Sequence, residues 1–348
     1  MIYSEFDGIR VSAISASVPE GVVDINSLKV TEDSKKIDNF IKKTGIAQVH
    51  KCDFDKTASD FSYTAAKILE NAGKYKPEEI GVLLDVTQTP DYRCPSTALA
   101  LHKRLGLGKS CIAFDINLGC SGFVYGVSVA ASILTASTAN KALVLVGDTL
   151  ARQRMKTTTR TSNTMLLFGD ASSAILLEKT KGFNIKTALM SDGTGFKVLG
   201  STYGAWKHPE EHANPPFDDM AVFSFTISEV PILLKAFMEK TNTVIEDYND
   251  LVLHQANMMI MKQIAKKVNM PLDKVPVSLD RYGNTSGASI PVSIVDKYGK
   301  CNDGRELNLL TSGFGVGLSW GVVSFKINVN DIFPMTIGKD TYDDGYLD

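Results

Sequence analysis

A pattern of short apolar runs alternating with longer helical segments occurs twice along this chain, and it restricts the fold more than any other feature. Alternation of this kind is typical of β-α-β units that build a largely parallel sheet. In the first half, the sequence predicts strands at residues 81–86, 111–116, 142–147 and 173–178, and helices at residues 58–73, 96–105 and 120–137. The first half is therefore expected to form an α/β unit.

The second half repeats this rhythm. Its predicted elements are helices at residues 222–240 and 258–268, a helix that starts near residue 289, and strands at residues 251–254, 307–310 and 319–327. We therefore expect two similar α/β halves packed as one unit, with helices buried between sheets, and a single continuous sheet is the alternative. The expected boundaries are residues 1–180, residues 181–330 and a C-terminal tail at residues 331–348.

Two further segments bear on the architecture. Residues 116–140 contain no charged side chain, a length that could cross a bilayer, but hydroxyl and amide side chains recur among them. Such a composition favours a helix buried between protein layers over a helix that faces lipid. Residues 195–220 are rich in Gly, Pro, His and acids, so they are expected to form a surface loop that could act as a lid.

The charge balance and the cysteines exclude several classes of protein. Lys and Arg total 37 against 39 Asp and Glu, a net charge of −2, so the chain lacks the basic excess that binds nucleic acids or anionic membranes. Five cysteines are scattered without CxxC spacing, which argues against a disulfide framework and a zinc cluster. No basic segment precedes the first apolar run, so no signal peptide is expected. These features predict a protein of the reducing cytoplasm.

The first candidate for chemistry is Cys120, in the segment DINLGCSGF at residues 115–123. A predicted strand leads into a turn bracketed by Gly119 and Gly122, and a predicted helix begins at the cysteine. Unpaired N–H groups at a helix start favour the thiolate, which is the reactive form, and the glycines allow close approach of a substrate. A buried cysteine without a function would show the same local pattern, so this segment alone does not establish that Cys120 is a nucleophile.

His254 and Asn284 are the next candidates. His254 ends the predicted strand in LVLHQAN, residues 251–257, and strand ends are where open α/β sheets place their ligand sites. Asn284 lies in RYGNTSGAS, residues 281–289, before an apolar segment. Taken singly, His254 could be a hydrogen-bonded core residue and Asn284 a helix cap.

The segment SGFGVGLSWG at residues 312–321 is a glycine-rich turn between two predicted strands. It could form a simple hairpin, or it could bring a backbone N–H up to a developing oxyanion. A nucleotide-binding loop is excluded, because these glycines do not lie between a strand and a helix.

Taken together and in this order, these segments resemble the β-ketoacyl-acyl carrier protein synthase III family of the thiolase superfamily. The resemblance extends from about residue 9 to residue 327, and it rests on NLGCSGF, LHQAN, GNTSGAS, FGDAS (residues 168–172) and the glycine turn. It implies a thiolase-like α/β fold with α-β-α-β-α layers, built from two duplicated halves with mixed five-stranded sheets, in a homodimer. It also implies thioesters of coenzyme A or acyl carrier protein as substrates, with no metal, nicotinamide or flavin cofactor.

The resemblance further implies roles for particular residues. Cys120 would take an acyl group from a thioester donor, and His254 and Asn284 would hold the thioester carbonyl of a malonyl-type extender as its carboxylate leaves. The resulting carbanion would attack the acylated Cys120. The backbone N–H groups of Cys120 and Val316 would form the oxyanion hole. Two neighbouring positions would bind substrate, Phe314 and Gly315.

Several positions depart from the usual family pattern. Lys43 stands where an arginine usually helps to bind coenzyme A, and Arg160 lies near the place of a second arginine. Lysine cannot make the planar stacked contact of arginine, so this departure favours acyl carrier protein over coenzyme A as the carrier of the donated acyl group. Cys94 stands where an aromatic residue often borders the acyl pocket, which predicts a primer larger than acetyl. Carrier docking, or merely a solvated helix face, is expected at three lysines that follow HQAN: Lys262, Lys266 and Lys267.

Three alternatives remain. The first is acyl transfer from Cys120 to an amine or hydroxyl acceptor in a specialised pathway, such as polysaccharide or secondary-metabolite synthesis. The second is a non-catalytic partner subunit of a condensing enzyme, which the joint presence of Cys120, His254 and Asn284 argues against. The third is a cysteine hydrolase, which the surrounding segments disfavour.

Overall fold

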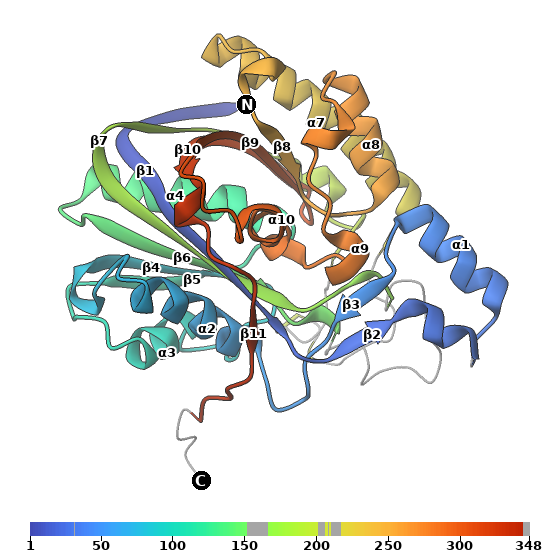
Figure 1. Ribbon diagram of the computed structural model, residues 1–348, viewed down its shortest axis with the longest axis horizontal. Helices are drawn as coiled ribbons and strands as arrows, with labels where there is room; N and C mark the ends of the chain where they lie inside the picture. Colours follow the sequence, from blue (N-terminus) through green and yellow to red (C-terminus); the bar gives the residue numbers. More distant parts are fainter. Residues whose placement is uncertain (31, 152–165, 201–205, 208, 210–216, 344–348) are drawn as a thin grey trace.

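Helices and sheets alternate in layers through this protein (Figure 1). The computed structural model covers residues 1–348 and describes all of them except residues 31, 152–165, 201–205, 208, 210–216 and 344–348. From one side to the other, the layers are outer helices, a first sheet, central helices, a second sheet and further outer helices. This arrangement confirms the predicted layered α/β fold.

The first sheet places three parallel strands side by side. Its order is β5 (Ile112–Ile116), β4 (Ile80–Val86), β6 (Lys141–Asp148) and β7 (Ala171–Ser191). β4 runs parallel to both β5 and β6, whereas β7 runs antiparallel to β6. The side chains of β4 and β6 are almost all buried, because helices cover both faces of the sheet. The carboxyl ends of β4, β5 and β6 therefore meet at one edge.

The second sheet contains β8 (Asp250–Leu253), β9 (Glu306–Gly315) and β10 (Ser319–Asn328). β8 is parallel to β9, and β9 and β10 form an antiparallel hairpin around the predicted glycine turn. The other edge of β10 pairs with residues 186–191 of β7. The two sheets are thus joined through β7.

Two long strands belong to both sheets. β1 (Ile2–Pro19) and β7 pair with each other in antiparallel fashion along most of their length. Residues 171–178 of β7 pair with β6 in the first sheet, and its later residues pair with β10 in the second. Among the described residues, each sheet has the predicted five strands when β1 and β7 are counted in both and the short β11 beside the end of β1 is set apart, and the hydrogen bonding is continuous from β5 to β8. The boundary predicted at residue 180 lies within β7.

Two strands are longer than the sequence predicts, for different reasons. β7 continues beyond residue 178 through a polar segment, because this part passes from one sheet to the other while it remains paired with β1. β9 continues beyond residue 310 through Gly313 and Gly315. Glycine usually weakens a strand, but a Cβ on Gly315 would lie only 2.5 Å from the Cβ of Cys120. The position therefore requires glycine.

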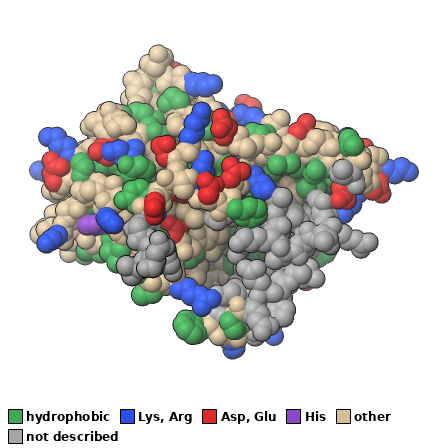
Figure 2. All heavy atoms as spheres, turned by 90° about the horizontal axis from the view of Figure 1, so that it is seen from below, with side chains coloured by type: hydrophobic (Ala, Val, Ile, Leu, Met, Phe, Trp, Pro, Cys, Tyr) green, Lys and Arg blue, Asp and Glu red, His purple; other side chains and the backbone are tan. Residues whose placement is uncertain are grey.

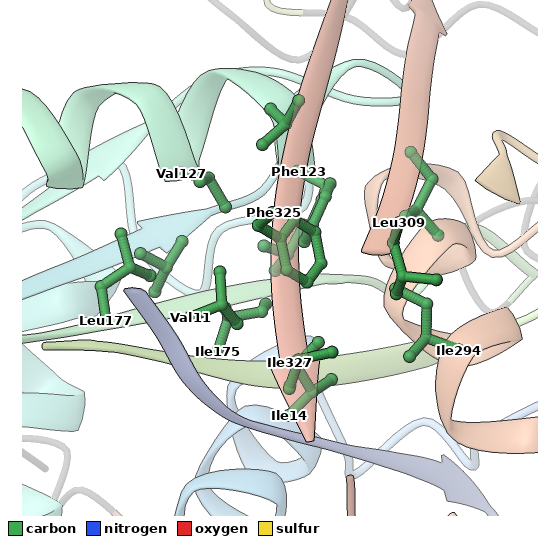
Figure 3. Packing of buried hydrophobic residues seen from close by; sticks show 14 of the residues in the cluster. Val11, Ile14, Phe123, Val127, Ile175, Leu177, Ile294, Leu309, Phe325 and Ile327 are labelled. Carbon is green, nitrogen blue, oxygen red and sulfur yellow. The ribbon is translucent and has the colours of Figure 1, made fainter. Parts of the chain in front are cut away.

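The central layer consists of α4 (Gly122–Ala136) and α10 (Ser289–Tyr298). Figure 3 shows both helices sharing one core with both sheets; its labelled side chains are Phe123, Val127, Ile294, Val11, Ile14, Ile175, Leu177, Leu309, Phe325 and Ile327. Most of α4 is buried. The uncharged segment at residues 116–140 thus contains a helix packed between protein layers, as its composition predicts.

The outer layers cover the remaining faces of the sheets. α2 (Ala58–Asn71) and α3 (Thr97–Arg104) pack on the first sheet, and α7 (Asp219–Thr241) and α8 (Met258–Lys267) pack on the second. By length and composition alone, α7 could cross a bilayer, and 39% of its most apolar window is buried. Its inner side chains belong to the core of the second sheet: Val230, Leu233, Leu234 and Phe237.

Smaller elements complete the fold. α1 (Ser34–Thr44), α9 (Leu279–Tyr282) and the strand pair of β2 (Val22–Asp24) and β3 (Gln48–His50) lie together at one end of the molecule (Figure 1). On the face shown in Figure 2, basic and acidic side chains are interspersed. This mixture agrees with the near balance of charge in the sequence.

The C-terminal tail, as far as it is described, lies against its own chain. β11 (Thr336–Gly338) pairs with the end of β1 in parallel orientation. Farther along, the Tyr342 N–H donates to an Asp60 carboxylate oxygen at 3.1 Å, and the Arg104 guanidinium carbon lies 4.4 Å from the centre of the Tyr342 ring. Arg104 is itself buried beside Asp60 and Asp91. The tail therefore caps a buried cluster of charges between α2 and α3.

Candidate active site

The candidate site lies where the carboxyl ends of four strands converge. Cys120 follows β5, Gln88 follows β4, Asp148 ends β6 and His254 follows β8. Open α/β sheets bind ligands at the carboxyl ends of their strands. Asn284 reaches the same region from the segment between α9 and α10. Side chains from both halves of the chain therefore contribute to one site.

Cys120 lies in the turn that joins β5 to α4, just before the helix begins. A hydrogen bond from the Gly122 N–H to the Gly119 carbonyl, 2.7 Å long, closes this turn. The cysteine is 5% exposed, and it packs against β9 so closely that a Cβ on Gly315 would lie 3.1 Å from its Sγ. The predicted place of Cys120, between a strand and the start of a helix, is confirmed.

His254 directly follows β8 and is 2% exposed. Its backbone N–H donates to the Ser312 carbonyl at 2.9 Å, and its ring meets the Phe314 ring edge-on with the centres 5.3 Å apart. The Nδ1 atom lies 2.7 Å from the Ser289 Oγ at the start of α10, and the Ser286 backbone acts to raise the pKa of the imidazole. β9 and the segment leading into α10 together fix the orientation of the ring.

Burial determines the protonation state of His254. Removal of the ring from water lowers the pKa of His254 from 6.5 to about 3, and the effect of the Ser286 backbone opposes this only in part. A buried imidazole with such a pKa is neutral throughout the physiological range. His254 can therefore donate or accept a hydrogen bond, but it does not carry a positive charge.

A buried neutral histidine makes the folded state sensitive to acid. Below pH 6.5 the unfolded chain binds a proton at His254, while the folded chain does so only near pH 3, so folding stability falls as the pH falls. The loss due to His254 should reach about 2 kcal/mol at pH 5. Chemical denaturation of the wild type and of His254→Gln at pH 7.5 and pH 5 measures this loss. Equal losses in the two proteins would contradict a buried neutral imidazole.

Asn284 is held by the segment FGDAS and by its own loop. Its backbone N–H donates to the Leu167 carbonyl at 2.9 Å, and its carbonyl accepts from the Gly169 N–H at 3.1 Å. The side-chain Oδ1 accepts the Ser286 N–H at 2.9 Å, so the amide NH2 group points the other way as a donor. The alternative role as a helix cap is wrong, because the N-cap of α10 is Ala288.

These contacts bring the three candidate segments together. Residues 313–315 of β9 contact both Cys120 and His254. A Cβ on Gly287 would lie 2.9 Å from the Gly119 carbonyl oxygen, so the Asn284 loop touches the turn that carries the cysteine. The segments that carry a buried sulfur, a neutral imidazole and an oriented carboxamide thus lie against one another.

Several residues near these side chains were not identified from the sequence patterns. Ser289 contacts His254, while Gln88 contacts both Ser286 and Asp148. Gln88 and Asp148 lie at the carboxyl ends of strands that the sequence predicts at residues 81–86 and 142–147. The strand-end argument that identifies His254 applies to them as well.

The remaining predicted residues are distributed more widely. Val316 is half-buried in the turn that follows Gly315. Lys43 is exposed in the last turn of α1, and Cys94 is exposed in the loop between β4 and α3. The three lysines predicted to dock a carrier protein are exposed on α8: Lys262, Lys266 and Lys267. Arg160 and part of the loop predicted at residues 195–220 lie outside the described residues.

Comparison with known proteins adds independent information. The family described as "3-Oxoacyl-[acyl-carrier-protein (ACP)] synthase III" matches residues 114–193, and its C-terminal part matches residues 238–327. The Beta-ketoacyl-[acyl-carrier-protein] synthase III of Streptococcus agalactiae is 31% identical over 334 residues, which cover 91% of this chain and 99% of the relative. The protein of the same name from Xanthomonas campestris is 33% identical over 319 residues, covering 90% of this chain and 96% of the relative.

Solved structures agree with these matches. A 3-oxoacyl-(acyl-carrier protein) synthase from Burkholderia xenovorans superposes with a TM-score of 0.86 at 29% identity, covering 97% of this chain and 99% of the other. OleA from Xanthomonas campestris superposes with a TM-score of 0.77 at 21% identity, covering 92% and 97%. At that identity, the second likeness concerns the fold alone.

Proposed function

Because this chain belongs to the 3-oxoacyl-[acyl-carrier-protein] synthase III family, it is a condensing acyltransferase of thiolase-like fold, and we propose that Cys120, His254 and Asn284 carry its chemistry. The reaction joins an acyl group on the enzyme to a malonyl-type thioester by decarboxylative Claisen condensation. The observation that supports these roles most strongly is the contact between the segments that carry a buried thiol, a neutral imidazole and an oriented amide.

Acylation of the enzyme is the first half-reaction. The Cys120 thiolate attacks the carbonyl carbon of an acyl thioester, and the carrier leaves as a thiolate when the tetrahedral intermediate collapses. The backbone N–H groups of Cys120 and Val316 stabilise the oxyanion in this proposal. Its support is the close contact between Gly315 and Cys120, since the next residue along the chain is Val316. Phe314 and Gly315 would border the bound acyl group.

Condensation is the second half-reaction. A malonyl-type thioester loses its carboxylate as carbon dioxide, and the electron pair left behind spreads onto the thioester oxygen. His254 and the NH2 group of Asn284 donate hydrogen bonds to that oxygen, and neutral donors placed in advance stabilise the developing charge. The low pKa of His254, about 3, keeps it neutral for this task. The carbanion then attacks the acylated Cys120, forms the carbon–carbon bond and releases the cysteine as a thiolate.

Neither half-reaction as proposed needs a metal or a redox cofactor, because the thioesters themselves supply the activated groups. No disulfide joins any of the five cysteines, all of which lie among the described residues, and this suits an enzyme of the reducing cytoplasm. We therefore infer a cytoplasmic location.

The substrate carrier is proposed to dock beside α8. Lys262 and Lys266 are exposed there on the same side as Met259, which is 45% exposed. Lys43 lies at the end of α1, which packs against α8. Lys267 is less available, because its Nζ donates to a backbone carbonyl of α7 at 2.7 Å. Basic side chains around an apolar residue suit an acidic carrier protein.

A homodimer is proposed through β5. Among the described residues, β5 is the outermost strand of the first sheet, with no further strand beside it. Its side chains are exposed or half-buried although most are apolar, and Ile112 is 48% exposed. An open apolar edge invites pairing with another chain. Light scattering should give a mass of twice 37.8 kDa, and a monomer at micromolar concentration would count against the proposal.

One experiment tests the proposed function. The purified protein is incubated with acyl thioesters of several chain lengths, on coenzyme A and on acyl carrier protein, and intact mass reveals any adduct at Cys120. A malonyl thioester is then added, and carbon dioxide and 3-oxoacyl product are measured. Both should appear. An adduct that passes only to amine or hydroxyl acceptors, without release of carbon dioxide, would instead support acyl transfer in a specialised pathway.

The same panel tests the role of Cys94. The small side chain predicts acceptance of primers longer than acetyl, and its exposure in the β4–α3 loop leaves it free to reach a partner subunit. Strict preference for acetyl would refute the role of Cys94 while leaving the condensation itself intact.

A further inference from the structure

Ser286 has an unusual backbone conformation next to the proposed catalytic residues. Its φ angle is +52°, in the left-handed region that residues other than glycine rarely adopt. Such a conformation is unfavourable and persists only when its surroundings enforce it. Strained residues of this kind concentrate at functional sites, so the contacts that enforce this conformation are of interest.

The contacts of Ser286 lead to a buried carboxylate. Its Oγ accepts a hydrogen bond from the Gln88 Nε2 at 2.8 Å, and the same Nε2 donates to the Asp148 Oδ2 at 3.4 Å. Asp148 is 1% exposed, and it also accepts from the Gln88 backbone N–H at 2.8 Å and from the Thr87 Oγ1 at 3.0 Å. The hydroxyl group of Ser286 is thus linked, through the Gln88 amide, to a buried carboxylate that the loop after β4 also binds.

The strained backbone of Ser286 serves two catalytic side chains at once. Its N–H donates to the Asn284 Oδ1 at 2.9 Å. This bond fixes the orientation of the amide, so the NH2 group of Asn284 points the other way. Its backbone also acts on the His254 imidazole, opposing the lowering of the pKa of His254. A rotation of Ser286 would therefore release the amide and change the surroundings of the imidazole.

We propose that Asp148, acting through Ser286, is a positioning residue for the condensation step: it holds the Ser286 backbone so that Asn284 and His254 present their donors to the same oxygen. This inference rests on the proposed roles of Asn284 and His254. It assigns no contact with substrate to Asp148. Burial raises the pKa of Asp148, and the hydrogen bonds from Ser286, Gln88 and Thr87 act in the opposite direction, as expected for a carboxylate that functions as an acceptor.

Two variants test the inference on separate half-reactions. Asp148→Asn keeps the size of the side chain and replaces one acceptor oxygen with a donor, and Ser286→Ala removes only the hydroxyl group. Both should load Cys120 with acyl groups at nearly the wild-type rate, followed by intact mass. Condensation should fall roughly 10- to 100-fold, as is usual when the partners of reacting groups are lost. The loss should appear in kcat, with the KM for the malonyl thioester little changed.

A matched variant separates this effect from the general cost of a lost carboxylate. Asp250 is 2% exposed and holds Lys297 and Tyr298, at the opposite end of β8 from His254. Asp250→Asn should reduce thermal stability without a selective loss of condensation. If Asp148→Asn fails to fold, Ser286→Ala still tests the inference, because it leaves the carboxylate of Asp148 in place.

The outcomes distinguish this inference from the proposed function. A folded Asp148→Asn or Ser286→Ala that condenses at the wild-type rate overturns the inference, and so does an equal loss in acyl loading and condensation. If Asn284→Ala condenses normally, the proposed roles themselves fail. If Asn284→Ala is impaired while the folded positioning variants are not, only the inference about Asp148 fails.

Discussion

Replacement of Cys120 with alanine should abolish the acyl adduct and lower condensation by roughly a thousandfold or more, because no other group at the site can form the acyl-enzyme thioester. The side chain is buried, and β9 packs directly against it, so the smaller alanine fits without strain. Intact mass after exposure to acyl thioesters measures the first effect, and formation of the 3-oxoacyl product measures the second.

Cys301→Ala is the matched control for this prediction. Cys301 forms no disulfide and follows the C-terminal end of α10, whose first residue, Ser289, is the one that contacts His254. That variant should load acyl groups as the wild type does. A stable adduct on Cys120→Ala, at any other cysteine, would mean that the nucleophile has been misassigned, and product formation without an adduct would exclude a covalent mechanism.

Replacement of Asn284 should separate the two half-reactions. In Asn284→Ala the acyl adduct should still form at Cys120, while condensation should fall by roughly 100- to 1000-fold, the usual effect of losing one donor to a developing oxyanion. The reason is that the amide NH2 group acts only on the thioester oxygen of the extender. Decarboxylation of the malonyl thioester, measured on enzyme loaded beforehand, is the direct readout.

Asn284→Asp sharpens the test. The aspartate keeps the shape of the side chain and can still accept the Ser286 N–H, which donates to the Oδ1 of Asn284 at 2.9 Å in the wild type. Its second oxygen, however, would present a negative charge where the substrate oxygen becomes negative. Condensation should therefore be at least as slow as in Asn284→Ala. A rate near that of the wild type in either variant would remove Asn284 from the mechanism.

The sequence predicted the centres of the secondary structure elements well, for a clear physical reason. β4, β6 and α4 are buried on nearly all sides, so their apolar runs are long and end at polar or glycine residues. The lengths of β7 and β9 were not predictable in this way. Their continuations are polar or glycine-rich, and they remain strands because β1, β10 and the cysteine turn lie beside them, which only the tertiary structure specifies.

The site was predictable in part for a related reason. Cys120, His254 and Asn284 lie in segments with recognisable local patterns, so the sequence identified them. Ser286, Gln88 and Asp148 contribute through hydrogen bonds that span up to 198 positions along the chain. No local pattern encodes such pairs. The left-handed conformation of Ser286 was equally hidden, since serine gives no sign of a positive φ angle.

β1 and β7 also have a mechanical consequence. Cys120 is delivered by the first sheet and His254 by the second, yet both sheets contain the same two unbroken strands. The two halves therefore have no hinge that would allow one half to rotate against the other. The spacing between sulfur and imidazole is set when the chain folds and not when a ligand arrives, as befits a catalyst that works by preorganisation. Any movement that admits substrate must come from surface loops, while the two sheets keep their relative position.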